Sequence, residues 1–250
     1  MEAEYALRIS RNVAKAVRKA VAQLSLEQRK KVVGNGVDGS PSKLVDVVAE
    51  RAALEILLKE KVTILSEEKG FVGEGDTYVA LDPIDGTFNA ERGIPFYSVS
   101  ICFSDSESLK DTFFGYVYSL ESDEEYFAAE GEAFKNEKMI SVSKKDDLTC
   151  DAIFYYPTKL LPFKRIRIFG SAALELCYIA EGRFDCFVDV RNMLRVFDVA
   201  AGIFIVKCAG GKVTDNNGLP LDNKKIRVGE RINIVAANPS LHKKLMELIK

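Results

Sequence analysis

The sequence contains no tryptophan, a single histidine and no uninterrupted apolar run long enough for a membrane span, which needs about 18 residues. We therefore expect no transmembrane helix. The histidine, His242, stands beside two lysines in a segment expected to be a C-terminal helix, and we expect it to be a surface residue rather than a catalyst. With so little histidine, acid–base chemistry must use carboxylates, hydroxyls and metal-bound water.

Cysteine pairs of the C-x-x-C type are also absent, which argues against a zinc site. Most of the five cysteines sit in apolar runs and are expected to be buried thiols. A bridge between Cys150 and Cys186 is left open, because it depends on geometry that sequence does not give. The five cysteines are Cys102, Cys150, Cys177, Cys186 and Cys208.

The sequence also has no large excess of positive or negative charge. The formal net charge is -2, so no global basic field would recruit nucleic acid or an acidic membrane. Residues 1–5 are acidic and lack a signal-peptide pattern, so we expect a cytoplasmic protein. The charged fraction of 29% together with the missing tryptophan is compatible with a thermophile.

The most informative segment is Leu-Asp-Pro-Ile-Asp-Gly-Thr at residues 81–87. Asp82 ends an apolar run that predicts a buried strand. Gly86 lets the backbone bend, and Asp85 repels Asp82 unless a cation lies between them. Mg²⁺ or Mn²⁺ suits carboxylate and carbonyl oxygens, and Gly86 and Thr87 offer N–H groups and a hydroxyl to a neighbouring anion. The alternative is an ordinary turn, because Asp, Pro and Gly are common turn residues.

Two further acidic features favour the metal site. Glu67 and Glu68 follow an apolar run at 62–65, and Asp198 precedes a segment with the character of a buried helix. Asp198 alone could be a helix N-cap. Three acidic groups at the ends of buried elements are harder to explain without a partner, because buried carboxylates need compensation.

These motifs resemble the inositol monophosphatase and fructose-1,6-bisphosphatase superfamily, most closely its archaeal dual-activity branch. The resemblance runs from the N-terminal helix to residues 233–238, although Phe197 stands where the family usually has tryptophan. It implies a layered α/β/α/β/α sugar-phosphatase fold of mixed α+β and α/β character. It also implies a homodimer or homotetramer.

The resemblance further implies a Mg²⁺-dependent phosphomonoesterase for fructose 1,6-bisphosphate and inositol 1-phosphate, in carbohydrate metabolism such as gluconeogenesis. Two or three Mg²⁺ ions, with Mn²⁺ as a substitute, would be held by carboxylates and one carbonyl. The first site would use Glu67, Asp82 and the Ile84 carbonyl; the second would use Asp82, Asp85 and Asp198; Asp38 would serve a third, looser site.

Three residues are expected to handle the attacking water. Thr87 would orient it, Asp46 would accept a hydrogen bond from Thr87, and Glu68 would accept from solvent. Alternatives remain for each acid. Asp46 could simply suit the first turn of a helix, Glu68 could be an exposed charge, and Asp38 could be solvated in a glycine-rich loop at 34–41.

Substrate selectivity is expected to depend on arginines. Arg191 stands seven residues before Asp198, where inositol-selective members of the family typically carry an acid, and its planar fork suits a second phosphate. Arg165 and Arg167 share one strand face and could line the same pocket, unless that face is merely solvated. The remaining candidates for substrate contact are Asp85, Gly86, Thr87, Ser171, Ala172 and Glu175, the last of which could instead meet Arg167 or solvent.

The pattern of elements changes along the chain. Residues 1–145 predict an α+β half with most metal ligands, and residues 146–250 an α/β half with Asp198 and the substrate residues, together forming one catalytic unit. We expect helices at 2–24, 42–59, 171–181, 198–210 and from 239, and strands at 61–65, 78–82, 97–104, 112–119, 124–129, 151–156, 165–169, 184–190 and 232–236.

Two other functions compete with this interpretation. A nucleotide-directed phosphatase for 3′-phosphoadenosine 5′-phosphate or NADP would need an aromatic shelf, which Tyr155 and Tyr156 could supply. A non-catalytic regulator that binds metal and anions on the same fold is the other alternative. The complete set of Glu67, Asp82, Asp85, Thr87 and Asp198 argues against it.

Overall fold

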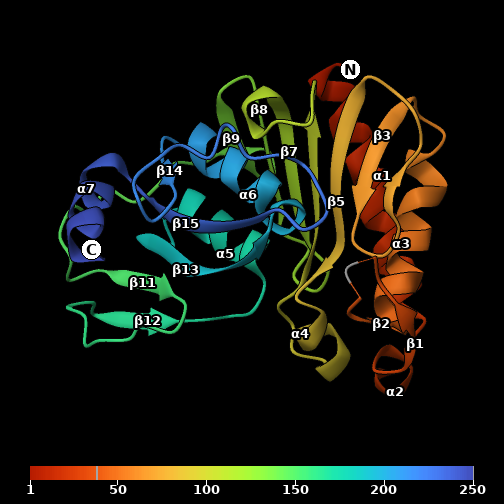
Figure 1. Ribbon diagram of the computed structural model, residues 1–250, viewed down its shortest axis with the longest axis horizontal. Coiled ribbons are helices and arrows are strands. Elements are labelled where there is room, and N and C mark those ends of the chain that lie inside the picture. The colour runs from red at the N-terminus through yellow and green to blue at the C-terminus, as the bar shows by residue number, and fades with distance from the viewer. Residues whose placement is uncertain (38, 250) are drawn as a thin grey trace.

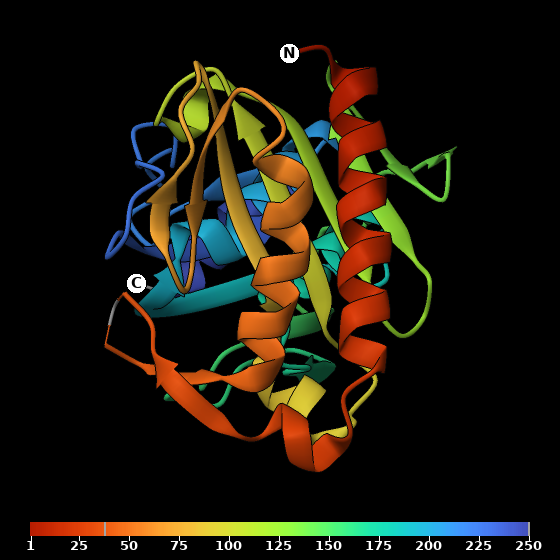
Figure 2. The same cartoon turned by 90° about the vertical axis from the view of Figure 1, so that its right-hand side faces the viewer.

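Two β-sheets and three layers of helices alternate in the computed structural model, which describes residues 1–37 and 39–249 (Figure 1). Helices α1 (Ala3–Ala22) and α3 (Leu44–Leu57) cover the outer face of the larger sheet, where they lie side by side (Figure 2). Helices α5 (Ala172–Ala180) and α6 (Val196–Cys208) lie between the sheets, and α7 (Pro239–Leu248) covers the far face of the smaller sheet. The expected layered α/β/α/β/α fold is confirmed.

The larger sheet has eight strands in the order β10-β9-β8-β7-β6-β5-β3-β4. Every neighbouring pair is antiparallel except β3 and β5, which are parallel. The strands are β3 (Val62–Ser66), β4 (Gly70–Val72), β5 (Thr77–Asp85), β6 (Ser98–Ser104), β7 (Thr112–Ser119), β8 (Glu125–Ala129), β9 (Glu132–Lys135) and β10 (Lys138–Met139).

The smaller sheet has five strands in the order β12-β11-β13-β15-β14. Strand β11 is parallel to both of its neighbours, whereas β15 is antiparallel to β13 and β14. The strands are β11 (Asp151–Phe154), β12 (Arg165–Arg167), β13 (Cys186–Arg195), β14 (Lys212–Thr214) and β15 (Arg231–Ala237). The remaining elements are α2 (Leu26–Arg29), β1 (Val32–Asn35), β2 (Pro41–Lys43), α4 (Thr87–Arg92) and a short 3₁₀ turn at Leu109–Asp111.

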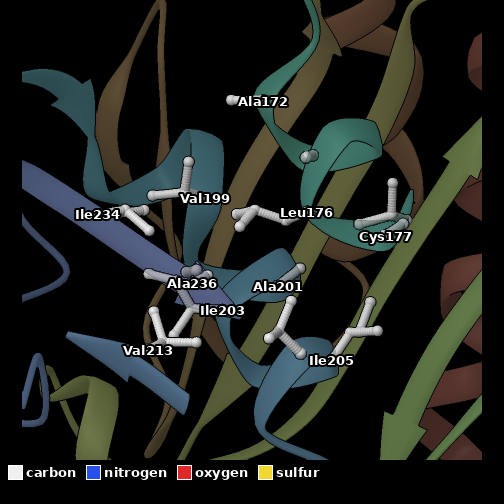
Figure 3. Packing of buried hydrophobic residues seen from close by; sticks show 14 of the residues in the cluster. Ala172, Leu176, Cys177, Val199, Ala201, Ile203, Ile205, Val213, Ile234 and Ala236 are labelled. Carbon is white, nitrogen blue, oxygen red and sulfur yellow. The ribbon is translucent and has the colours of Figure 1, made fainter. Parts of the chain in front are cut away.

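Three apolar cores join these layers. On α1, buried residues recur every three or four positions from Ala6 to Val21, so one helix face packs on the outside of the larger sheet. The central core lies between the sheets and around α5 and α6, where Leu176, Ile203 and Ile234 interdigitate (Figure 3). A third core seats α7 on the smaller sheet. Because α6 packs on both sheets, the two halves of the chain share one core. The division at residue 145 stays a prediction.

Some local expectations were wrong. The glycine-rich segment expected as a loop at 34–41 begins and ends in paired strands, because Gly34 and Asn35 belong to β1 and Pro41 to β2, and Asp38 lies outside the described residues. Strand β13 runs on to Arg195, because pairing with β15 resumes after a register shift between Asp189 and Leu194.

His242 is not a surface residue. Its side chain is 1% exposed, and its Nε2 lies 2.9 Å from the Thr214 hydroxyl on β14. Burial lowers the pKa of His242 to about 4. His242 lies on the buried face of α7 with Leu241 and Leu245, so the two lysines beside it in the sequence did not indicate exposure.

Cys150 and Cys186 both carry free thiols, so the bridge left open by the sequence is not formed. A hydrogen bond with the Cys150 thiol, together with burial, raises the pKa of Cys186. Within residues 1–37 and 39–249, none of the helices combines the length and apolarity needed to span a bilayer.

Candidate active site

The expectation that Asp82 ends a strand is wrong, because β5 runs on to Asp85 with a register shift between Asp82 and Asp85. This irregular end of β5, called the Asp82–Asp85 turn, lies at the lower end of the larger sheet, where α4 begins (Figure 1). The Asp82 carboxylate accepts a hydrogen bond from the Ile84 N–H at 3.0 Å, which tightens the turn. Gly86 has φ +97°, and a Cβ there would lie 3.0 Å from the Gly170 carbonyl oxygen. The glycine is therefore required both by its backbone conformation and by this close approach.

Asp85 links the turn to the second half of the chain. Its Oδ2 accepts hydrogen bonds from the Ser171 hydroxyl and from the Ala173 N–H, the latter at 2.8 Å. Ser171 occupies the N-cap position of α5, but its hydroxyl does not cap that helix. Ser171 is also fully buried and supports Asp85, and its direct contact with substrate stays a prediction.

Thr87 and Asp46 meet as expected from the sequence. The Thr87 hydroxyl lies 2.9 Å from Asp46 Oδ1, to which it donates, and 3.2 Å from the Ile84 carbonyl oxygen. Asp46 lies in the first turn of α3 and is 5% exposed. The pair therefore joins the outer helix layer to the start of α4, next to the Asp82–Asp85 turn.

Glu68 is partly buried, so the alternative that it is simply an exposed charge is wrong. Its carboxylate accepts a hydrogen bond from the Ser42 hydroxyl on β2. Its backbone N–H donates to Glu50 Oε1 at 3.1 Å, and the same oxygen accepts from the Ser66 hydroxyl. Glu50 was missed by the sequence reasoning, although an acid at a helical spacing among apolar residues of α3 would have marked it as buried.

Arg195 is the second residue that the sequence reasoning missed. Its guanidinium contacts Glu67 and Asp198, with Nε 3.1 Å from both Asp198 oxygens. Asp198 was expected just before the helix, but it is the third residue of α6, and its carboxylate accepts from the Arg195 N–H at 3.1 Å. A basic residue one turn before an acid at a helix start was the available signal.

Burial dominates the electrostatics of this site. It raises the pKa of Asp46 to about 7 and the pKa of Asp85 to about 7, and holds the pKa of Asp82 well above its usual range. Repulsion from Glu67 and Asp198 adds to the effect at Asp82. The pKa of Glu67 is also raised by burial, against the opposing pull of Arg195.

This donor set suits a hard divalent cation, because several buried carboxylates share one guanidinium as countercharge. The carboxylates do not converge on their own: across residues 1–37 and 39–249, no three acidic, histidine or cysteine side chains are gathered at metal-binding distances. Arg195 holds Glu67 and Asp198 instead.

Arg191 lies on β13. Asp189 is fully buried, and its carboxylate accepts hydrogen bonds from Arg191 Nε at 3.0 Å and from Arg191 Nη2 at 2.6 Å. The guanidinium carbon lies 4.5 Å from the ring centre of Tyr155 and 5.1 Å from that of Tyr156. Arg191 is therefore held on three sides.

Glu175 meets neither Arg167 nor solvent. It is 0% exposed and accepts hydrogen bonds from the Tyr155 hydroxyl and from the N–H groups of residues 169 and 170. These bonds hold the turn that packs on Gly86, and direct contact of Glu175 with substrate stays a prediction. Ala172 begins α5 and is 6% exposed.

Arg165 and Arg167 are exposed on β12, the edge strand of the smaller sheet. Arg165 pairs with Asp151 at 3.3 Å, and Arg167 donates to its neighbour's carbonyl at 2.8 Å. These contacts are compatible with the alternative that this strand face is simply exposed to solvent. The contribution of both arginines to substrate binding stays a prediction.

Fold and site together define a sugar-phosphatase architecture with an acidic centre at the end of β5. The chain belongs to the inositol monophosphatase family, whose model matches residues 2–250. This is a family of metal-dependent phosphatases, generally with Mg²⁺.

Two curated relatives and one solved structure illustrate the similarity. A fructose-1,6-bisphosphatase/inositol-1-monophosphatase of Archaeoglobus fulgidus is 60% identical, with 100% of both chains covered. A bifunctional NADP phosphatase/NAD kinase of Methanococcus maripaludis is 35% identical over 96% of this chain, which spans only 48% of that protein. A solved inositol monophosphatase–fructose 1,6-bisphosphatase superimposes with a TM-score of 0.87 and 32% identity, covering 100% of this chain and 98% of the other.

Proposed function

We propose that the protein is a Mg²⁺-dependent phosphomonoesterase that hydrolyses fructose 1,6-bisphosphate and inositol 1-phosphate. The observation that carries the proposal is the Thr87–Asp46 hydrogen bond beside the Asp82–Asp85 turn. The similarity to the Archaeoglobus fulgidus protein supports the choice of substrates.

The acidic centre would hold the cofactor. Glu67, Asp82, Asp85, Asp198 and the Ile84 carbonyl would bind Mg²⁺, for which Mn²⁺ could substitute, in two or three sites. Bound metal would neutralise the phosphate ester and lower the pKa of a coordinated water.

Thr87 would position the attacking water. Because its hydroxyl proton is directed to Asp46, the oxygen lone pairs are available to accept a hydrogen bond from water. As the water gives its proton to the Thr87 oxygen, Thr87 would pass its own hydroxyl proton to the Asp46 carboxylate. Glu68 would hold further solvent at the same edge.

The phosphate would lie against the start of α4. A helix begins there with N–H groups that have no partner inside the helix, and these suit phosphate oxygens. Gly86 presents no side chain to obstruct the approach. Asp85 would contact the phosphate end of the substrate, and Ala172 would line the part of the site that binds the sugar.

Arg191 would recognise the second phosphate of the bisphosphate. Its side chain is 27% exposed, so one edge of the guanidinium can meet a ligand. Arg165 and Arg167 would add to this cationic side. We also propose a homodimer or homotetramer in the cytoplasm, as sizing chromatography and fractionation would test.

A nucleotide-directed phosphatase is the second candidate. Tyr156 is 68% exposed beside Arg191 and could stack on a base. The Methanococcus maripaludis relative, named as an NADP phosphatase/NAD kinase, makes NADP the substrate to include.

The test is phosphate release from four substrates with and without Mg²⁺: fructose 1,6-bisphosphate, inositol 1-phosphate, NADP and 3′-phosphoadenosine 5′-phosphate. We expect Mg²⁺-dependent release from the first two. Asp82→Asn should lower turnover by at least about a hundredfold, because it removes a charge that binds metal. It should also abolish the rise in melting temperature that Mg²⁺ causes in wild type.

The matched control is Asp222→Asn, a charge change at a partly exposed ion pair with Lys207. It should keep wild-type turnover and the Mg²⁺ effect. If folded Asp82→Asn retains more than about a tenth of wild-type activity, the role given to Asp82 is wrong. Preference for NADP would favour the second candidate.

A further inference from the structure

The Arg191 guanidinium is unusually well fixed for a partly exposed arginine. Asp189 accepts two parallel hydrogen bonds from it and a third from the Arg191 backbone N–H at 3.1 Å. This is the bidentate geometry in which arginine is most strongly oriented. Tyr155 and Tyr156 add cation–π contacts. Because Nε and Nη2 both bind Asp189, Nη1 lies on the other edge of the guanidinium, without a hydrogen-bond partner among the described residues.

The surrounding framework fixes these partners in turn. Asp189 is 0% exposed on β13, and the Tyr155 hydroxyl is anchored by the buried Glu175. Tyr156 has φ +48° and Asn192 has φ +55°, in a region that residues other than glycine rarely adopt. Tyr156, whose ring contacts Arg191, and Asn192, which follows Arg191 in the chain, both have left-handed backbone, which indicates that tertiary structure holds this region in place.

We infer that Asp189 is a positioning residue for substrate selectivity: it orients Arg191 so that the Nη1 edge meets the second anionic group of a bisphosphate. The inference rests on the proposed function and deepens it. Asp189 itself touches no substrate, because its side chain is fully buried.

Charge alone gives the opposite expectation. Asp189 neutralises Arg191, so it weakens any long-range attraction for an anion. If attraction were what mattered, removal of the Asp189 charge would improve use of the bisphosphate. If a directed hydrogen bond is what matters, the same change would release the guanidinium and impair it. The sign of the effect therefore separates the two mechanisms.

The pairing also complicates the simplest variant. Arg191→Ala would leave the Asp189 carboxylate buried without its cation, close to where the second phosphate is expected. Loss of activity in that variant would combine a lost contact with a new repulsion. Asp189→Asn keeps the side-chain shape and avoids this problem.

The experiment measures kcat and KM for fructose 1,6-bisphosphate and inositol 1-phosphate in wild type and Asp189→Asn. We expect kcat/KM for the bisphosphate to fall about five- to tenfold, the range for partial loss of a charged hydrogen bond. The fall should appear in KM, because the second phosphate is remote from the reacting bond. Inositol 1-phosphate should change less than about twofold, since it has no second anionic group.

Arg191→Lys is the companion variant. It keeps the positive charge but cannot make two parallel hydrogen bonds to Asp189, so it should reproduce the selective rise in KM. It also tests the inference if Asp189→Asn fails to fold. Asp222→Asn again serves as the control for a remote charge change, and it should alter neither substrate.

The inference is overturned if the ratio of kcat/KM for the two substrates stays at the wild-type value or shifts toward the bisphosphate. It is also overturned if both substrates lose activity equally, which would assign Asp189 to the fold. If the wild-type protein releases phosphate from inositol 1-phosphate but not from fructose 1,6-bisphosphate, the bisphosphatase proposal is refuted, and this inference with it. A selective loss on the bisphosphate supports both.

Discussion

Replacing Thr87 by valine tests the centre of the proposed mechanism. Valine keeps the shape of threonine but removes the hydroxyl that lies 2.9 Å from Asp46 Oδ1. If the hydroxyl orients water, kcat should fall by about 10²–10⁴, the range for a positioned proton-transfer group. KM should change less than about threefold, because the interaction is made mainly in the transition state. Thr87→Ser, which retains the hydroxyl, should remain within about tenfold of wild type.

The same change has a cost in stability that can be worked out. Asp46 is 5% exposed and would lose a hydrogen bond that helps lower its pKa. Leaving such a buried acceptor unsatisfied costs about 1–3 kcal/mol. At about 2–4 °C per kcal/mol for a chain of this size, the melting temperature should fall by about 2–12 °C. Activity is therefore measured well below the melting temperature of the variant.

A steady-state assay of phosphate release gives both constants, and a thermal melt gives the stability. The reasoning would be refuted by a variant whose kcat stays within threefold of wild type, or whose only defect is a higher KM. The double variant with Asp46→Asn should be hardly worse than Thr87→Val alone, because the two residues act through one hydrogen bond.

Two further predictions concern charges that the fold buries. Arg195→Met should lower the free energy of unfolding without Mg²⁺ by about 3 kcal/mol, because it leaves Glu67 and Asp198 without their shared cation, and Mg²⁺ should restore more stability to this variant than to wild type. Urea unfolding with EDTA and with Mg²⁺ measures this, and equal Mg²⁺ effects would contradict it. His242→Gln should weaken the pH dependence of stability by about 2 kcal/mol between pH 7 and pH 5. The pKa of His242 is lowered from 6.5 to about 4 in the folded state, so wild type loses stability as pH falls below 6.5, when the unfolded chain takes up a proton that the folded chain refuses. Equal urea midpoint shifts in both proteins would show that His242 is not the group responsible.

The mixed α+β and α/β pattern and the Asp82–Asp85 motif could be predicted because they depend on local patterns, whereas the layered arrangement followed from the family resemblance. Residues 77–85 form a buried strand followed by turn residues, and the spacing of apolar residues marks α1. The Thr87–Asp46 hydrogen bond could be anticipated only through the family resemblance, since the two residues are 41 positions apart.

The partners of the buried charges could not be predicted in the same way. Arg195 reaches Glu67 across 128 positions, and nothing local to either residue indicates the contact. Asp189 had a weaker signal: it is a single acid in the apolar run of β13, with an arginine two residues later on the same strand face. That spacing identifies a buried pair once the strand is known to be central in its sheet. The side of α7 that carries His242 likewise depended on how the helix docks.

The buried acids of this protein differ in how their charge is compensated, and the difference favours one of them as the cation ligand. Asp189 has an arginine fork, and Glu50 accepts from a hydroxyl and a backbone N–H. Asp82 is 1% exposed, accepts a hydrogen bond from the Ile84 N–H and is surrounded by Glu67, Asp85 and Asp198. Burial and repulsion from these acids raise the pKa of Asp82 against the opposing pull of Arg195, so positive charge added next to Asp82 would stabilise its ionised form. Divalent metal is the simplest source of that charge. For this reason we expect neutralisation of Asp82, rather than of a better-compensated acid, to abolish both metal binding and turnover.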